Sequence, residues 1–278
     1  MLAGRDSLPL AGRVGVGGTR GKAMNIADEL SIQLYSMRNY GDLDRQLEAL
    51  AGLGFRRVET VAGHIADARN TRARLDAHGL ESPTGHVPLA DLRSRLDWVA
   101  EQAKTLGIVQ LFMPAVPLEE RDRPAEHWRA VGAELADIAE RLSAKGLGLG
   151  YHNHHWELKP YADGSRPLEH LFEAAAGSKL CWQADIAWLV RGEVEPVAWL
   201  ERYRDRLVSA HVKDIAPSGG NLDEDGWADV GQGTLDWPRL WREALARGAR
   251  WMVLEHDKPS DAVRFARVSR TFLLEHCA

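Results

Sequence analysis

The chain has 278 residues, of which 45% are hydrophobic and 27% are charged, and its formal net charge is −5. This composition argues against a disordered chain, and the mild acidity argues against a nucleic-acid partner, because nucleic-acid-binding proteins are usually basic. No apolar run approaches the roughly 20 residues that span a bilayer, so no membrane partner is expected. The two cysteines, Cys181 and Cys277, fit no Cys-x-x-Cys pattern, which predicts reduced thiols in a cytoplasmic protein.

The first 26 residues differ in composition from the rest of the chain. The segment from Met1 to Asn25 is rich in glycine, arginine and small residues, and it lacks the continuous apolar run of a secretory signal. Such a stretch buries too little surface to offset the entropy of ordering it. We therefore predict a flexible extension over residues 1–26 and one folded domain over residues 27–278, with Met24 as an alternative functional start.

From residue 30 onward, short apolar runs typical of β-strands alternate with segments of helical periodicity. The predicted strands are Leu30–Tyr35, Phe55–Thr60, Glu81–Val87, Val109–Ala115, Leu147–Asn153, Leu180–Ile186, Leu207–Ile215 and Trp251–His256. The predicted helices are Leu43–Gly52, Leu92–Leu106, Trp128–Leu142, Leu168–Ala175, Val194–Tyr203, Trp237–Ala246 and Ala262–Leu274. Glycines that suit a left-handed helix end follow several helical segments, at Gly54, Gly79, Gly107 and Gly146.

The strict alternation of strands and helices predicts an α/β fold with a parallel sheet, because parallel strands need crossover connections. Eight such units in about 250 residues predict closure into a single-domain (β/α)8 barrel of the TIM type. No GxGxxG motif follows the first strand, which disfavours a Rossmann fold. The longest irregular stretch, residues 216–236, follows the seventh strand and is therefore expected on the active-site face.

Ionisable side chains follow one another at the ends of the last four predicted strands. The fifth strand runs into residues 151–157 (Tyr-His-Asn-His-His-Trp-Glu), the sixth ends in Asp185, and the seventh carries His211 and Lys213. The eighth ends in Glu255. These strands are neighbours, so their ends converge on one mouth, where carboxylates and an imidazole suit a divalent ion such as Mn²⁺, Mg²⁺, Co²⁺ or Zn²⁺. Without an ion, the carboxylates would repel one another.

Each of these residues also has a purely structural interpretation. Asp185 is suited to cap the helix that follows it, and His211 can be a core histidine bonded to the backbone. Glu255 can pair with Lys213 or Arg57. Several such residues in register at consecutive strand ends favour a metal site over a set of unrelated structural roles.

These motifs together resemble the xylose-isomerase-like barrel superfamily of sugar phosphate isomerases and epimerases. The resemblance extends over about residues 30–274 and is carried by the segments 31–38, 54–59, 85–88, 151–157, 185, 211–214, 231–237 and 255. It implies one divalent ion, with Mn²⁺ first and Mg²⁺, Co²⁺ or Zn²⁺ as alternatives. The ligands that it implies are Asp185, His211 and Glu255, together with a carboxylate from strand five. Strand five carries Tyr151 and His152 where many members have that Glu, so Glu157 is expected as the fourth ligand and His152 is the alternative.

The resemblance also implies chemistry at the carbon next to a carbonyl. A bound ion stabilises the enediolate, and carboxylates take and return the α-proton. Glu157 and Glu255 are the predicted pair of proton-transferring residues. The predicted substrate-binding side chains are His86, His152, His154 and Lys213, although His86 also suits a capping role before Pro88.

Four functions remain open at this point. The first is a metal-dependent isomerase or epimerase of a keto-sugar or keto-glycoside, and the alternative is a metal-dependent dehydratase or lyase of a keto-cyclitol (an inosose) or a 3-keto-glycoside. A nuclease of the apurinic-endonuclease type ranks below both, because the segment Asp185–Trp188 lacks a histidine three residues after the aspartate. A non-catalytic sugar-binding barrel would not need the carboxylates. The expected partner is thus a small carbohydrate, with a homo-oligomer left open.

Overall fold

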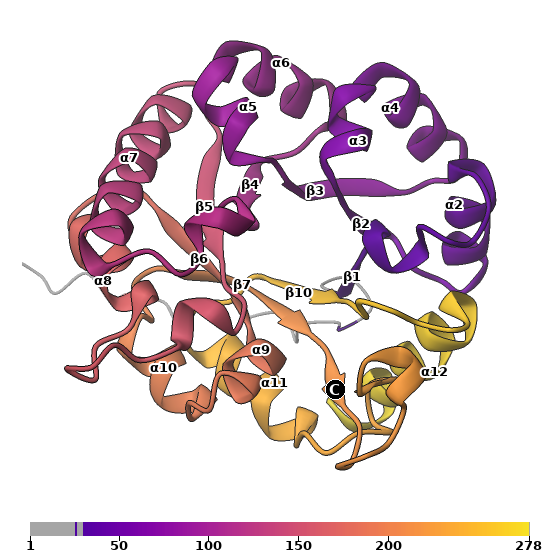
Figure 1. Cartoon of the computed structure of the whole chain (residues 1–278). Helices are drawn as coiled ribbons and strands as arrows, with labels where there is room; N and C mark the ends of the chain where they lie inside the picture. Colours follow the sequence, from indigo (N-terminus) through magenta and orange to yellow (C-terminus); the bar gives the residue numbers. More distant parts are fainter. Residues whose placement is uncertain (1–25, 27–29, 278) are drawn as a thin grey trace, which may run out of the picture.

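Eight parallel strands close into a barrel in this computed structural model, which describes Ile26 and residues 30–277. The order of strands around the barrel is β1-β10-β7-β6-β5-β4-β3-β2, and helices surround the strands on the outside (Figure 1). The predicted (β/α)8 barrel is therefore confirmed. The predicted extension lies outside the described residues except for Ile26, which is buried in the core.

The barrel strands lie inside the eight predicted runs, and each strand is shorter than its run. They are β1 (Leu30–Gln33), β2 (Arg57–Thr60), β3 (Glu81–His86), β4 (Gln110–Met113), β5 (Gly148–His152), β6 (Cys181–Asp185), β7 (Leu207–Val212) and β10 (Trp251–Leu254). The seventh run also contributes β8 (Asp214–Ile215), which leaves the barrel and pairs antiparallel with β9 (Trp227–Ala228). The apolar patterns continue past the strand ends because the following turns are buried as well.

The helices agree with the sequence pattern where their buried face is large and apolar. They are α2 (Leu43–Gly52), α3 (Ala62–Ala66), α4 (Ala68–Ala77), α5 (Leu89–Ser94), α6 (Leu96–Leu106), α7 (Ala125–Ser143), α8 (Pro167–Ala174), α9 (Ile186–Arg191), α10 (Pro196–Arg202), α11 (Trp237–Ala246) and α12 (Ala262–His276). Four short 3-10 turns complete the set: η1 (Leu34–Met37), η2 (Leu118–Glu120), η3 (Trp156–Leu158) and η4 (Leu222–Glu224). None of the helices among the described residues is both long and apolar enough to cross a bilayer.

Two kinds of difference from the predicted helices have physical causes. The predicted helix 92–106 is two helices, because Arg95 leaves helical geometry with φ −149° and ψ 45°. Helix α4 was not predicted, and its buried residues Ala68, Thr71 and Leu75 include only one large apolar side chain. The four predicted left-handed glycines are confirmed, with φ between 66° and 85°.

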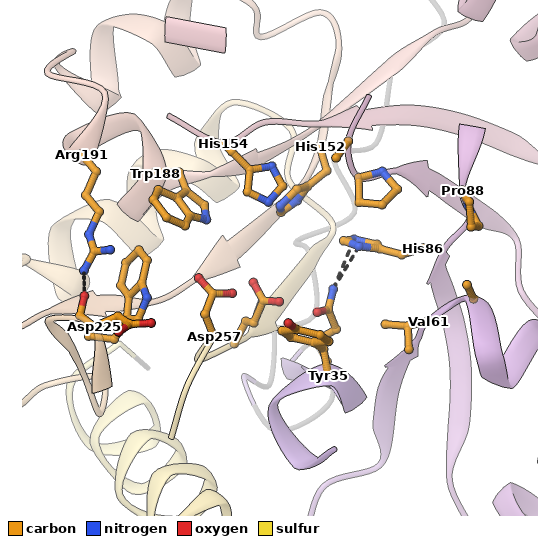
Figure 2. Close-up of a pocket in the computed structure, with 16 residues that line it drawn as sticks. Tyr35, Val61, His86, Pro88, His152, His154, Trp188, Arg191, Asp225 and Asp257 are labelled. Atoms are coloured by element: carbon orange, nitrogen blue, oxygen red, sulfur yellow. Dashed lines mark hydrogen bonds between the residues drawn. The ribbon is translucent and has the colours of Figure 1, made fainter. Parts of the chain in front are cut away.

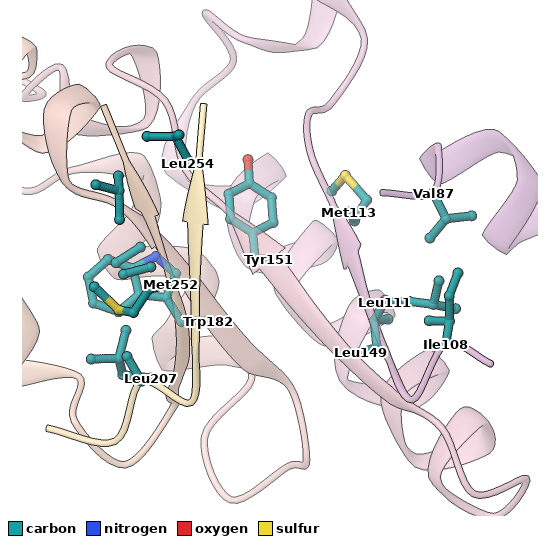
Figure 3. Packing of buried hydrophobic residues seen from close by; sticks show 14 of the residues in the cluster. Val87, Ile108, Leu111, Met113, Leu149, Tyr151, Trp182, Leu207, Met252 and Leu254 are labelled. Atoms are coloured by element: carbon teal, nitrogen blue, oxygen red, sulfur yellow. The ribbon is translucent and has the colours of Figure 1, made fainter. Parts of the chain in front are cut away.

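Strand alternation separates an apolar outer layer from a polar barrel interior. Leu111, Met113, Leu149 and Tyr151 point outward and pack in the layer between the strands and the helices (Figure 3). His152 has the opposite parity to Tyr151 and lines the cavity at the barrel mouth. The inward-pointing residues at the carboxyl ends of the strands are therefore the ones that meet at the mouth of the barrel.

A glycine makes room for the floor of this interior. A Cβ at Gly150 would lie 2.6 Å from the ring of Phe112 and 3.2 Å from the backbone of Cys181. Phe112 fills that space and meets the ring of His86 edge-on, with centroids 6.4 Å apart. Gly150 thus allows an aromatic ring to close the barrel beneath the histidine at the end of β3.

One carboxylate ties the long loop after β7 to the barrel. Asp214 accepts hydrogen bonds from the backbone N–H groups of Ile215, Gly231, Gly233 and Leu235, at 2.9 to 3.3 Å. Burial nevertheless raises the pKa of Asp214, although the four amides work against that rise. The loop is held with Trp227 over the mouth of the barrel, as expected for the irregular stretch 216–236.

Candidate functional site

A cavity of about 490 Å³ opens at the carboxyl ends of the barrel strands. Figure 2 shows its residues converging from the strand ends and from the loop after β7. Its polar residues are Gln33, Tyr35, His86, His152, His154, Arg191, Asp225, Glu255 and Asp257. Its other lining residues are Val61, Ala62, Pro88, Pro114, Ala115, Trp188 and Trp227. The predicted substrate-binding residues His86, His152 and His154 are therefore brought together here.

Two overlapping groups of buried side chains have the spacing of metal ligands. Asp185, His211 and Glu255 each offer one ligand atom, and these atoms lie within 4.8 Å of one another. His86, His152 and His211 form a second group by the same measure. Because His211 belongs to both groups, the five side chains form one continuous cluster, which we call the strand-end cluster.

His211 is held between two carboxylates. Its Nδ1 lies 2.8 Å from Glu255 Oε2 and its Nε2 lies 2.8 Å from Glu59 Oε1. Burial by itself would lower the pKa of His211, but Glu255 and Glu59 outweigh it and raise the pKa to about 10. Both ring nitrogens therefore donate in this arrangement, and coordination of an ion through this ring requires the loss of one proton.

Asp185 has one structural oxygen and one free oxygen. Its Oδ1 accepts a hydrogen bond from the backbone N–H of Trp188 at 2.9 Å and caps α9, which confirms the capping role. Its Oδ2 is buried and makes no hydrogen bond, although Lys213 Nζ lies 3.3 Å away. Burial raises the pKa of Asp185 to about 6, while Lys213 and His211 work in the opposite direction.

Lys213 lies among three carboxylates. Its Nζ is 2.6 Å from Asp257 Oδ2, 3.1 Å from Glu255 Oε2 and 3.3 Å from Asp185 Oδ2. Burial would lower the pKa of Lys213, but these carboxylates raise it well above its usual value. The pairing of Glu255 with Lys213 that the sequence suggested is therefore present.

His152 presents a ring nitrogen that can bind an ion. Burial holds the pKa of His152 well below its usual value, with the neighbouring His211 and His154 acting in the same direction, so the ring is neutral. Its Nδ1 lies 3.0 Å from Oε1 of Gln183. That oxygen can only accept, so Nδ1 carries the proton and Nε2 keeps its lone pair, 3.9 Å from Asp185 Oδ2.

Glu157 does not join the strand-end cluster. It is buried, its Oε1 accepts a hydrogen bond from the hydroxyl of Tyr151 at 2.6 Å, and its Oε2 accepts one from the backbone N–H of His154 at 2.8 Å. Tyr151 points away from the barrel interior, and turn η3 directs Glu157 toward it. Of the two predicted fourth ligands, only His152 therefore lies beside Asp185 and His211.

Glu59 is a site residue that the sequence analysis missed. It is fully buried, and it accepts hydrogen bonds from Gln33 Nε2 and Gln183 Nε2, each at 2.9 Å. Its carboxylate also contacts the ring of His211. Burial would raise the pKa of Glu59, but His86 and His211 hold it well below its usual value. The available signal was an acidic residue inside the predicted strand 55–60.

Asp257 is the second missed residue. It lines the cavity and is the nearest carboxylate to Lys213, and it lies two residues after Glu255 in the turn that follows β10. Glu59, Asp185 and Glu255 are buried and Asp257 is half-buried, and these four carboxylates surround the amine of Lys213 and the ring of His211. Carboxylates this close together repel one another when they are ionised.

Comparison with known proteins agrees with this architecture. The chain matches the family described as xylose isomerase-like TIM barrel over residues 47–274. The rhizopine catabolism protein MocC of Rhizobium meliloti is 27% identical over 156 residues, which are 51% of this chain and 47% of MocC. The match thus spans about half the length of that curated relative.

Solved structures share the fold over almost the whole chain. A sugar phosphate isomerase/epimerase from Parabacteroides distasonis is 18% identical with a TM-score of 0.73, and the match covers 91% of this chain and 96% of that one. The 3-keto-D-glucoside 4-epimerase from E. coli is 16% identical with a TM-score of 0.66, over 88% of this chain and 98% of that one. The family match covers most of the sequence, and the chain belongs to the xylose isomerase-like TIM barrel family.

Proposed function

We propose that this chain is a divalent-metal-dependent isomerase or epimerase that moves the proton next to the carbonyl group of a keto-sugar or keto-glycoside. The observation that carries the proposal is the strand-end cluster, where two buried carboxylates and three histidines bring their ligand atoms together beside a cavity of substrate size. A divalent ion at this centre would offset the repulsion among its carboxylates.

The side chains at this centre fit such an ion. Asp185 offers a buried oxygen without a hydrogen bond, and His152 offers a ring nitrogen with a free lone pair. His211 and Glu255 would complete the set, and this mixture of carboxylate oxygen and imidazole nitrogen suits Mn²⁺, Co²⁺, Zn²⁺ or Mg²⁺. When bound, the ion supplies a Lewis acid that polarises the carbonyl group of the substrate.

Glu255 is the proposed proton acceptor. It lines the cavity, and although burial would raise the pKa of Glu255, Lys213 and His211 hold it well below its usual value. The carboxylate is therefore ionised and able to take the α-proton. Asp257 lines the same cavity and contacts the same amine, so it is the proposed second carboxylate, in place of Glu157.

The histidines of the cavity would hold the hydroxyl groups of the substrate. Burial holds the pKa of His154 well below its usual value, and its Nδ1 makes no hydrogen bond within the protein. A neutral imidazole both donates and accepts, which matches a sugar hydroxyl. In the second candidate, a dehydratase of a keto-cyclitol or 3-keto-glycoside, the carboxyl that has taken the α-proton would return it to the departing hydroxyl, which leaves as water while the ring of His154 hydrogen-bonds it.

One experiment distinguishes these outcomes. The metal-loaded protein is incubated in D₂O with ketoses, 3-keto-glycosides and inososes, and NMR follows deuterium incorporation, epimerisation and loss of water. We expect deuterium at the carbon next to the carbonyl with the wild-type protein and with a Glu275→Gln control, whose side chain is exposed on α12. Glu255→Gln should abolish this exchange. Unchanged exchange in that variant, or no exchange with any ketone, would contradict the proposal.

A further inference from the structure

The cavity has an apolar side as well as the charged side described above. Val61 and Ala62 follow β2, Pro88 follows β3, and Pro114 and Ala115 follow β4. We call these five residues the apolar wall. Figure 2 shows Val61 and Pro88 across the pocket from Trp188 and Arg191. The side chains of the apolar wall present neither a charge nor a hydrogen-bonding group to a ligand.

The charged side does not suit an anionic ligand. Three carboxylates line the cavity together with one arginine, Arg191. Each carboxylate is already paired with a lysine, Asp225 with Lys258, and Glu255 and Asp257 with Lys213. The guanidinium of Arg191 is already engaged, because its Nη2 donates to the backbone carbonyl of Asp225 at 2.8 Å and it lies 3.3 Å from the ring centroid of Trp227. Lys213 is held by its own three carboxylates.

A phosphate group would therefore find little to bind it. Phosphate sites usually offer free arginine or lysine side chains, or the free N–H groups of a helix N-terminus. Helix α9 begins beside the cavity, but the carboxylate of Asp185 already accepts from the N–H of Trp188 in its first turn. A phosphate monoester carries nearly two negative charges, and away from the proposed ion the described lining residues offer it no cationic side chain that lacks a partner of its own.

Resting on the proposed function, we infer that the substrate is an uncharged keto-sugar or keto-cyclitol bearing an apolar substituent, and that phosphorylated sugars are excluded. The polar ring lies among the histidines and carboxylates, and the substituent lies against the apolar wall. A cavity of about 490 Å³ falls within the range of pockets for drug-sized ligands, about 300–1,000 Å³. It therefore has room for a ring with a substituent.

Binding measurements test this without relying on turnover. Trp188 and Trp227 line the cavity, so the intrinsic fluorescence of the metal-loaded protein reports on occupancy. The probes are methyl 3-keto-β-D-glucopyranoside, its 6-phosphate and the phenyl analogue. We expect the phenyl compound to bind at least about tenfold more tightly than the methyl compound, since a phenyl ring buries several more apolar carbons. The 6-phosphate should bind at least about tenfold more weakly, because its charge would lose water without gaining a free cationic partner.

Variants locate the effect on the apolar wall. Val61→Thr keeps the shape of the side chain and adds a hydroxyl, and Ala115→Asp adds a charge. Both should reduce the preference for the phenyl compound and leave the affinity for the methyl compound within about twofold. Ala90→Asp, at an exposed position on α5, is the matched control and should change neither affinity.

The outcomes separate this inference from the proposed reaction. Binding of the 6-phosphate as tight as that of the methyl compound overturns the inference, as does equal binding of the methyl and phenyl compounds or no binding of any probe. Binding in the expected order without proton exchange in D₂O overturns the proposed reaction and leaves the inference about the pocket standing.

Discussion

The protonation of Glu157 should make the free energy of unfolding depend on pH, and replacement by glutamine should remove that dependence. Burial raises the pKa of Glu157 to about 7, even though Tyr151 and the backbone N–H of His154 donate to the carboxylate and work in the opposite direction. In Glu157→Gln, the amide oxygen can accept from His154 and the NH₂ group can donate to the rotated hydroxyl of Tyr151. The variant should therefore fold.

The magnitude follows from the difference between the folded and unfolded states. The ordinary pKa of glutamate is 4.5, against about 7 for buried Glu157. Between these values the folded state binds more protons than the unfolded state, so stability falls as pH rises. At about 1.36 kcal/mol per pKa unit, the loss on going from pH 4 to pH 8 is about 3 kcal/mol from this group.

Urea unfolding of the metal-free protein, followed by tryptophan fluorescence at several pH values, measures this loss. We expect the stability difference between wild type and Glu157→Gln to change by about 3 kcal/mol across the window, whereas Glu275→Gln should follow the wild type. Tyr151→Phe removes one donor to the carboxylate and should move the decline to higher pH. A constant difference between wild type and Glu157→Gln would refute this reasoning, and lost metal binding in that variant would restore Glu157 as a ligand.

Three further predictions concern the ion, the core and the loop. Metal analysis should find about one divalent ion per chain of the wild-type protein, and Asp185→Asn or His152→Ala should lower that metal content. A metal content near zero in the wild-type protein after Mn²⁺ reconstitution would contradict the proposed site. Leu135→Ala should destabilise the protein by about 2–5 kcal/mol in urea unfolding, because Leu135 is fully buried, whereas Leu118→Ala, at a side chain 74% exposed, should cost under about 0.5 kcal/mol. Asp214→Asn should speed hydrogen exchange at the loop amides that its carboxylate binds, with a local loss of about 1–3 kcal/mol; unchanged protection would show that other contacts hold the loop.

The periodicity of the sequence was sufficient to predict the barrel. Helices α2 and α11 have the predicted bounds because a single apolar face repeats through each of them. Short helices next to strand ends were harder to predict. Helix α9 directly follows β6, and its six residues are too few to establish a period of 3.6.

The site residues were predictable where strand order alone brings them together. Asp185, His211 and Glu255 end neighbouring strands, so their proximity follows from the parallel sheet. Glu59 was missed because its partner His211 is 152 residues away and meets it only across the closed barrel. Glu157 was expected at the mouth from its closeness to strand five, but one 3-10 turn is enough to redirect a side chain.

The anchoring of the loop after β7 has a consequence for how this scaffold can be altered. Asp214 accepts from main-chain amides, and one of the residues that bind it has to be a glycine, since a Cβ at Gly233 would overlap the carboxylate of Asp214. The side chains between Asp214 and Gly233 take no part in the attachment to Asp214. The segment 216–230 has a second attachment, since Arg264 pairs with Glu224 and Asp229. Asp225 and Trp227 lie between these points and line the cavity, so they are the positions of the loop at which ligand preference can be changed with both attachments kept.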